Sequence, residues 1–216
     1  MNTKDGSSEM QELPIATQGD EQTVFFHDDP SVDLAVFPIT LDQTRYDALP
    51  MSQNMLLDRD GLSKNEITEG TDVFFTGLFA AYPGNKRNVP ITRFGKLALV
   101  PEEPIQFADR SAMFYLMEAQ SYGGNSGSPV FFYAGLERVP GALTMGEPFL
   151  KLAGVVSGRF NETLPVQGIQ TGVTSVVSPN IGIMAVVPSY QLREILFGMR
   201  LLEMRRKAAA KQPPGA

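Results

Sequence analysis

The feature that most constrains the fold is a series of short apolar segments, separated by clusters of glycine, proline and aspartate, that runs from Gln22 to Val187. Several of these segments alternate apolar and polar residues, which is the period of a strand with one buried face. We expect strands at residues 22–27, 33–39, 72–79, 91–100, 113–119, 128–133, 149–157, 172–177 and 182–187, with a weaker candidate at 13–17. The longer intervals 52–70, 135–147 and 159–171 are expected to be loops. Many short strands in succession predict an all-β barrel or sandwich.

A single helix is expected to close the chain after the last strand. Ser189 is placed to cap its first turn. Apolar residues then follow at helical spacing, namely Leu192, Ile195, Leu196, Met199, Leu201 and Leu202. Basic residues gather in the last turns, where they complement the negative end of the helix dipole. Residues 211–216 are expected to form a solvated tail.

Composition excludes several classes of function. The chain has 216 residues, enough for one large domain or two small ones. Its net charge of −6 argues against nucleic-acid binding, which needs a basic surface to neutralise phosphates. It has no cysteine and one histidine, which argues against a structural zinc site. No apolar run reaches the ~18 residues of a membrane span.

The most informative motif is Y-G-G-N-S-G-S-P-V at residues 122–130, which places Ser126 in a glycine-lined loop directly before an apolar strand. Small neighbours let a substrate carbonyl approach the hydroxyl, and glycine lets backbone N–H groups converge on one point. The motif does not fit the G-x-S-x-G elbow of the α/β-hydrolases, because Ser128 stands where the last glycine belongs. It does not fit a phosphate-binding loop either, because no lysine follows the glycines. The alternative is a plain Gly/Ser/Asn turn between two strands.

This motif fits the pattern G-[DN]-S-G-[GS]-P and resembles the nucleophile loop of the chymotrypsin-like serine proteases, with Asn125 as in their bacterial HtrA-like branch. The resemblance implies that Ser126 is the nucleophile and that the N–H groups of Gly124 and Ser126 form the oxyanion hole. It implies a protein or peptide substrate and requires no cofactor or metal.

Two further segments strengthen the resemblance. The strand V-D-L-A-V-F, residues 32–37, resembles the family's aspartate strand, which makes Asp33 the triad carboxylate, expected to be buried and specifically paired. G-V-V-S-G, residues 154–158, resembles the strand beside the specificity pocket. Ser157 is then expected to hydrogen-bond near Asp33, and the backbone of Ser157 and Gly158 to pair with an extended substrate. Gln120 falls at the floor of that pocket.

The resemblance covers roughly residues 22–199 and predicts the fold. We expect an all-β, chymotrypsin-like double β-barrel with an incomplete N-terminal barrel and a C-terminal helix. Residues 1–100 would form the partial first barrel and the region between the barrels. Residues 101–188 would form the second barrel with the serine loop, and 189–216 the helix and tail.

The histidine of the triad is the point at which the chain departs from the family. His27 is the sole histidine, lies only six positions before Asp33 and lacks the family's [TS]-A-x-H context. We therefore assign it to a surface turn and identify no catalytic histidine. The leading hypothesis is a serine endopeptidase whose histidine-bearing N-terminal segment is missing from this chain. The alternatives are a catalytically inactive pseudo-protease that binds extended peptides, and a structural β-protein without a site.

Overall fold

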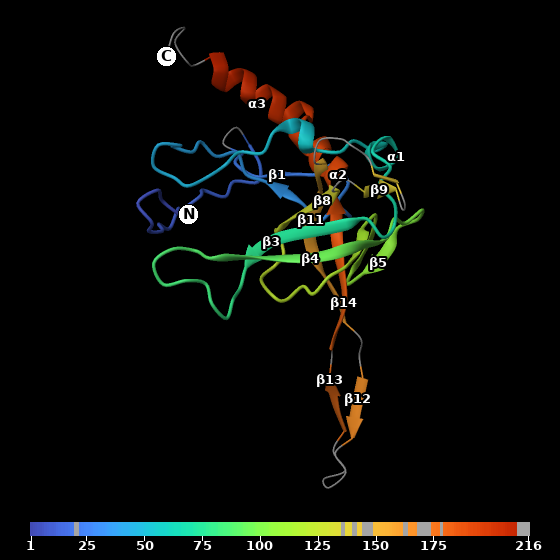
Figure 1. Ribbon diagram of the computed structural model, residues 1–216. Coiled ribbons are helices and arrows are strands. Elements are labelled where there is room, and N and C mark those ends of the chain that lie inside the picture. The colour runs from blue at the N-terminus through green and yellow to red at the C-terminus, as the bar shows by residue number, and fades with distance from the viewer. Residues whose placement is uncertain are drawn as a thin grey trace.

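The alternating apolar segments form a closed barrel of six antiparallel strands (Figure 1). The structure is a computed structural model that describes residues 1–19, 22–134, 137–139, 142–143, 149–161, 164–167, 174–177 and 179–210, with side chains outside 134–148 and 162–178. Around the barrel the strands follow the order β11, β14, β7, β4, β3, β8. Their bounds are Asp72–Leu78 for β3, Pro90–Leu99 for β4, Tyr115–Glu118 for β7, Pro129–Ala134 for β8, Phe149–Asn161 for β11 and Asn180–Pro188 for β14.

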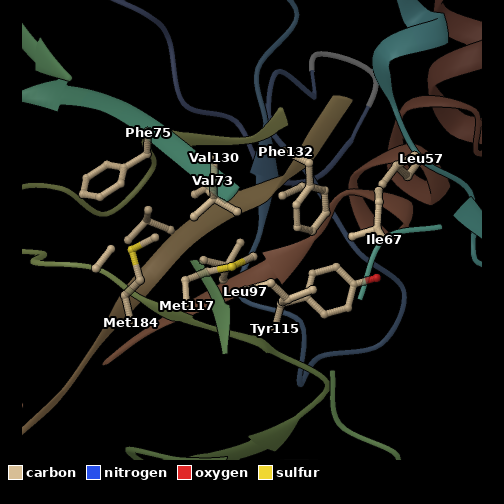
Figure 2. Packing of buried hydrophobic residues seen from close by; sticks show 14 residues of the cluster. Leu57, Ile67, Val73, Phe75, Leu97, Tyr115, Met117, Val130, Phe132 and Met184 are labelled. Atoms are coloured by element: carbon tan, nitrogen blue, oxygen red, sulfur yellow. The ribbon is translucent and has the colours of Figure 1, made fainter. Parts of the chain in front are cut away.

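The barrel is filled by apolar side chains from every one of its strands (Figure 2). In β3, for example, Val73 and Phe75 point inward and are fully buried, while the residues between and beside them are more exposed, as the period-2 pattern predicts. Leu57 and Ile67 come from the segment before β3 and pack beside Phe132 at one end of this core. The buried apolar cluster is thus continuous with part of the N-terminal region.

Shorter elements surround the barrel. Three hairpins are formed by β5 (Ile105–Phe107) with β6 (Arg110–Ala112), by β9 (Glu137–Val139) with β10 (Ala142–Leu143), and by β12 (Leu164–Gln167) with β13 (Thr174–Val177). The strands β9, β10 and β12 lie within the intervals 135–147 and 159–171, which we expected to be loops. Parts of both intervals fall outside the described residues. Residues 172–173 of the expected strand 172–177 also fall outside them. Between residues 52 and 70 lie a 3-10 turn, η1 (Gln53–Met55), and one helical turn, α1 (Gly61–Lys64).

The C-terminal helix is present but differs from the expectation in two ways. It consists of α2 (Ser189–Leu196) and α3 (Met199–Ala210), interrupted at residues 197–198. Ser189 does not cap it, because Pro188 occupies the N-cap position and Ser189 is already helical. The Ser189 hydroxyl is buried and has no hydrogen-bond partner in the described part of the chain. None of the described helices is both long and apolar enough to cross a membrane, and the tail 211–216 lies outside the described residues.

The N-terminal region forms much less regular structure than expected. The strands expected at 22–27 and 33–39 shrink to β1 (Phe25–Phe26) and β2 (Ala35–Val36), which form a separate two-stranded sheet among the described strands. Isolated bridges join Thr3 to Tyr46 and Leu56 to Leu152. The closed barrel takes its first strand, β3, from Asp72. What the structure establishes is a mostly β chain with one closed barrel and a C-terminal helix.

Candidate functional site

The loop that carries Ser126 is a series of tight turns leading into β8. The Asn125 N–H donates to the Tyr122 carbonyl at 3.1 Å, and the Ser128 N–H donates to the Asn125 carbonyl at 3.0 Å. Gly124 and Gly127 have φ values of +91° and +87°, a left-handed region that other residues rarely adopt. These two glycines therefore set the direction in which the Ser126 hydroxyl leaves the loop.

Asn125 fixes the loop to the end of β3. Its side chain is almost fully buried, with 1% of the residue exposed. The Oδ1 atom accepts the Tyr122 N–H at 2.9 Å, and Nδ2 donates to the Leu78 carbonyl at 3.3 Å. An amide is needed here because one atom accepts while the other donates. The sequence motif singled out Asn125 by family resemblance alone, and this structural role had no local signal.

The other side of the loop is attached to β11. The Gly127 N–H donates to the Val156 carbonyl at 2.8 Å, and the Val156 N–H donates to the Ser128 carbonyl at 2.9 Å. Ser126 is thus held between β3 and β11, the two barrel neighbours of β8. A backbone fixed on both sides is what a positioned nucleophile requires.

Ser126 and Asp33 are linked through one residue, Ser157. The Ser126 Oγ donates to the Ser157 carbonyl at 2.9 Å, and the Ser157 Oγ donates to Asp33 Oδ2 at 2.6 Å. All three residues line one open cleft of about 450 Å³, together with Leu192 of α2. Asp33 and Ser126, which are 93 positions apart in the sequence, therefore line the same cleft. The hydrogen bond that we expected from Ser157 near Asp33 is present, and Asp33 itself accepts it.

Asp33 is more exposed than expected. We expected a buried carboxylate, but its side chain is 46% exposed, because β2 lies at the surface and only short segments surround it. It does have specific partners, since Arg110 Nη1 lies 3.1 Å from Asp33 Oδ1 while Ser157 binds the other oxygen. Sequence reasoning missed Arg110, which stands in the β5–β6 hairpin and carries no motif.

The two N–H groups that the resemblance assigns to an oxyanion hole have no acceptor in the described part of the chain. The Gly124 and Ser126 N–H groups make none of the loop's backbone hydrogen bonds, whereas the N–H groups of Asn125, Gly127 and Ser128 all do. Donors at positions 124 and 126 are thus available to a ligand oxygen. Unoccupied backbone donors are one requirement of an oxyanion hole.

The remaining expected substrate contacts lie around this loop. Gln120 does not line the cleft shared by Asp33 and Ser126; its carbonyl accepts a hydrogen bond from Arg93 at 3.0 Å. Gly158 follows Ser157 in β11 and pairs with Ala185 of β14. The Phe107 ring covers Gly158 so closely that a Cβ there would lie 2.7 Å from its Cζ. On the side away from β14, the register of β11 with β8 ends at Val155, which leaves Ser157 and Gly158 at an edge that no other described strand occupies.

His27 is engaged elsewhere. Its Nδ1 accepts the Asp29 N–H at 3.0 Å, so the neutral ring carries its proton on Nε2, which lies 2.8 Å from Glu194 Oε2. His27 lines a separate hollow with residues of α2 and α3 and does not line the cleft of Ser126. Neither ring nitrogen is free to accept a proton from the Ser126 hydroxyl. Within the described residues no group of three acidic, histidine or cysteine side chains is placed to hold a metal ion.

No protein-family model matches the chain, and neither curated proteins nor solved structures show a significant similarity to it. The likeness to the chymotrypsin-like proteases therefore rests on the motifs of the sequence and the arrangement of the residues they contain.

Proposed function

We propose that this chain carries the nucleophile and the carboxylate of a serine endopeptidase of the chymotrypsin-like class, and that the imidazole of the site is not supplied by the chain itself. The observation that carries the proposal is the cleft in which Ser126 and Asp33 face each other across Ser157. We further propose that the closed barrel corresponds to the second of the two barrels of that fold.

The chemistry needs a base between the two residues. An imidazole hydrogen-bonded to Asp33 would accept the Ser126 proton as Oγ attacks the carbonyl carbon of a peptide bond. The free N–H groups of Gly124 and Ser126 would hold the oxyanion. When the acyl-enzyme forms, the imidazolium would return its proton to the departing amine. The Ser126 hydroxyl must first turn away from the Ser157 carbonyl, which is then free to accept an N–H of the substrate.

Without that base the hydroxyl stays protonated and is a poor nucleophile. In the chymotrypsin-like proteases themselves, removal of one triad member leaves a residual catalysis of ~10³–10⁴ over water. The chain alone should therefore react slowly with reagents that label activated serines.

Chemical complementation tests the proposal. A fluorophosphonate should label Ser126 slowly in buffer and about tenfold faster with added imidazole, less than the ~10²–10⁴-fold of a positioned base. 1-Methylimidazole should act more weakly, because it has no N–H to donate to Asp33. The rate is measured by intact-mass spectrometry, and the modified residue is identified by peptide mapping.

Two variants serve as controls. Ser126→Ala should not be labelled. Asp33→Asn removes the charge but keeps an oxygen that can accept the hydrogen bond from Ser157. In this variant imidazole and 1-methylimidazole should accelerate the labelling of Ser126 equally. Labelling of Ser126 that neither base accelerates would contradict the proposal.

One observation favours a second candidate, a pseudo-protease that binds extended peptides. The β11 edge at Ser157 and Gly158 offers backbone groups for strand addition, a mode that needs no base. Binding of extended peptides together with a complete lack of base-dependent labelling would favour this candidate.

A further inference from the structure

Arg93 is a cation attached to both sides of the segment that leads into the serine loop. It stands in β4, opposite Phe75 of β3. Its Nη1 donates to the Gln120 carbonyl at 3.0 Å, and its guanidinium carbon lies 4.7 Å from the centre of the Tyr122 ring. A second ring, that of Phe79, lies 6.0 Å away. The guanidinium is therefore held in one place by contacts with residues 120 and 122.

Tyr122 connects this cation to the nucleophile. The Tyr122 N–H donates to Asn125 Oδ1, and the Tyr122 carbonyl accepts from the Asn125 N–H. Tyr122 thus belongs to the turn that positions Ser126. Any movement of the serine loop would move the aromatic surface on which Arg93 rests.

The positive charge of Arg93 has no carboxylate partner among the described residues. By contrast Arg87, in the β3–β4 connection, lies 2.7 Å from Asp47, and Arg110 is paired with Asp33. The Nε of Arg93 is buried without an acceptor in the described part of the chain, so only the outer guanidinium atoms can meet a ligand. In a chain of net charge −6, an unpaired arginine held against the segment that leads into the serine loop is a feature that attracts anions.

The position of Arg93 relative to the serine loop determines which residues of a bound peptide its guanidinium would contact. The serine loop runs between β11, to which Gly127 is bonded, and the end of β3, to which Asn125 is bonded. A peptide that pairs with the β11 edge at Ser157 and crosses Ser126 must leave over the end of β3. Phe79, Tyr122 and Arg93 lie there.

We infer that Arg93 gives this site a preference for peptides with an aspartate or glutamate side chain close to the reacting bond, on the side away from β11. The inference rests on the proposed function, because it assumes that an extended peptide crosses Ser126. The planar guanidinium binds carboxylates well, and the two aromatic rings keep it oriented.

Peptide binding to the full chain tests the inference without any turnover. The probes are fluorescein-labelled octapeptides of alanine and valine in which one position at a time carries glutamate or its neutral isostere glutamine. Fluorescence anisotropy at low salt should show a three- to tenfold tighter Kd, about the range of an exposed to half-buried ion pair, for glutamate at the favoured position. Arg93→Gln should bring the ratio of the two Kd values close to one.

Two further variants separate charge recognition from a structural role. Arg87→Gln removes the same charge from the same hairpin, where it is already paired, and should leave the ratio unchanged. Arg93→Lys keeps the charge without the planar fork and should retain part of the preference. A glutamate preference that survives in Arg93→Gln, or equal binding of both peptide series to the native chain, overturns the inference while leaving the proposed function intact. Failure to bind any of the peptides overturns the inference and counts against the proposed function as well.

Discussion

The barrel and the N-terminal region of this protein are stabilised in different ways. The six strands close on themselves, and their inward side chains form a core in which Val73, Phe75, Met117 and Phe132 are all fully buried. In the described part of the first fifty residues, the regular structure is one pair of two-residue strands and two isolated bridges, and several large apolar side chains are exposed. Among these are Met10, Leu13, Ile15, Phe26, Phe37, Ile39 and Leu49.

This difference divides the candidate site. Ser126 and its loop are fixed to β3 and β11 of the barrel by backbone hydrogen bonds and the buried Asn125. Asp33 belongs to the N-terminal region and is held by two side-chain contacts, with Ser157 and Arg110. The candidate nucleophile therefore lies on the barrel, and the candidate carboxylate on a region with few backbone hydrogen bonds, which we expect to open more easily. Variants in the two regions test this division.

Truncating one phenylalanine in each region measures the contrast directly. Phe75→Ala removes a fully buried ring from the barrel core and should lower the free energy of unfolding by about 3–5 kcal/mol. Phe37→Ala removes a ring that is 40% exposed and should cost less than about 1 kcal/mol. Urea denaturation followed by circular dichroism compares the two. Equal losses would show that the N-terminal region is packed as firmly as the barrel.

The boundary between the two regions can be located with leucines. Leu57 precedes the barrel in sequence but is buried in the barrel's core, beside Phe132. Leu57→Ala should therefore cost about 2–4 kcal/mol. Leu49→Ala, at a position that is 97% exposed, should change the stability by less than about 0.5 kcal/mol. If Leu57→Ala were as mild as Leu49→Ala, the barrel would be a unit that begins only at β3.

Alkaline pH should act on the barrel through Tyr115. Burial, and to a lesser extent the neighbouring Tyr190, raises the pKa of Tyr115 above the ordinary tyrosine value of about 10. A pKa raised in the folded state contributes stability that is complete below pH ~10 and is lost as the pH rises toward the folded pKa, by up to about 1.4 kcal/mol per pH unit.

The comparison of variants isolates this tyrosine. Tyr115→Phe should lose less stability than the native protein between pH 9 and pH 11, values bracketing the ordinary pKa of about 10. Tyr82→Phe removes the phenol of a tyrosine that is well exposed and serves as the control. Parallel alkaline losses in the native protein and Tyr115→Phe would contradict the assignment.

The same contrast between the barrel and the N-terminal region explains which strands could be predicted from the sequence. The barrel strands were predictable because each is a short apolar or alternating run bounded by turn residues, as β3 is. In β4 the alternation does not mark the buried face, because Phe94 is 66% exposed while Arg93 and Gly95 are partly buried. The segments 22–27 and 33–39 show similar local patterns, yet they form only β1 and β2. A strand exists only with a partner, and no pattern within a segment identifies its partner.

The wrong expectations about the cap of the C-terminal helix and the burial of Asp33 have similar causes. Ser189 is a good capping residue by type, but the chain turns into the helix one residue earlier, at Pro188. The contact between Ser157 and Asp33 was expected through family resemblance. The exposure of Asp33 and its pairing with Arg110 depend on the tertiary arrangement of distant segments, which local sequence does not encode.

A smaller effect is expected at the contact between His27, which directly follows β1, and Glu194 of α2. His27 is hydrogen-bonded to Glu194, which also lies 2.6 Å from Arg59. His27→Ala removes one partly buried hydrogen bond and should lower the stability by about 1 kcal/mol. Because that bond secures the N-terminal region, limited proteolysis should cleave the variant faster within residues 1–50 and leave the barrel intact.

The same variant also distinguishes a base added from solution from a base supplied by His27. Since both ring nitrogens of His27 are occupied away from Ser126, imidazole-dependent labelling of Ser126 should proceed in His27→Ala at the native rate. Glu194→Gln, which keeps an acceptor for His27 and removes the charge, is the matched control and should behave likewise. A loss of labelling in His27→Ala alone would mean that the N-terminal region swings His27 into the cleft, and that the carboxylate and the base move together on the less stable half of the molecule.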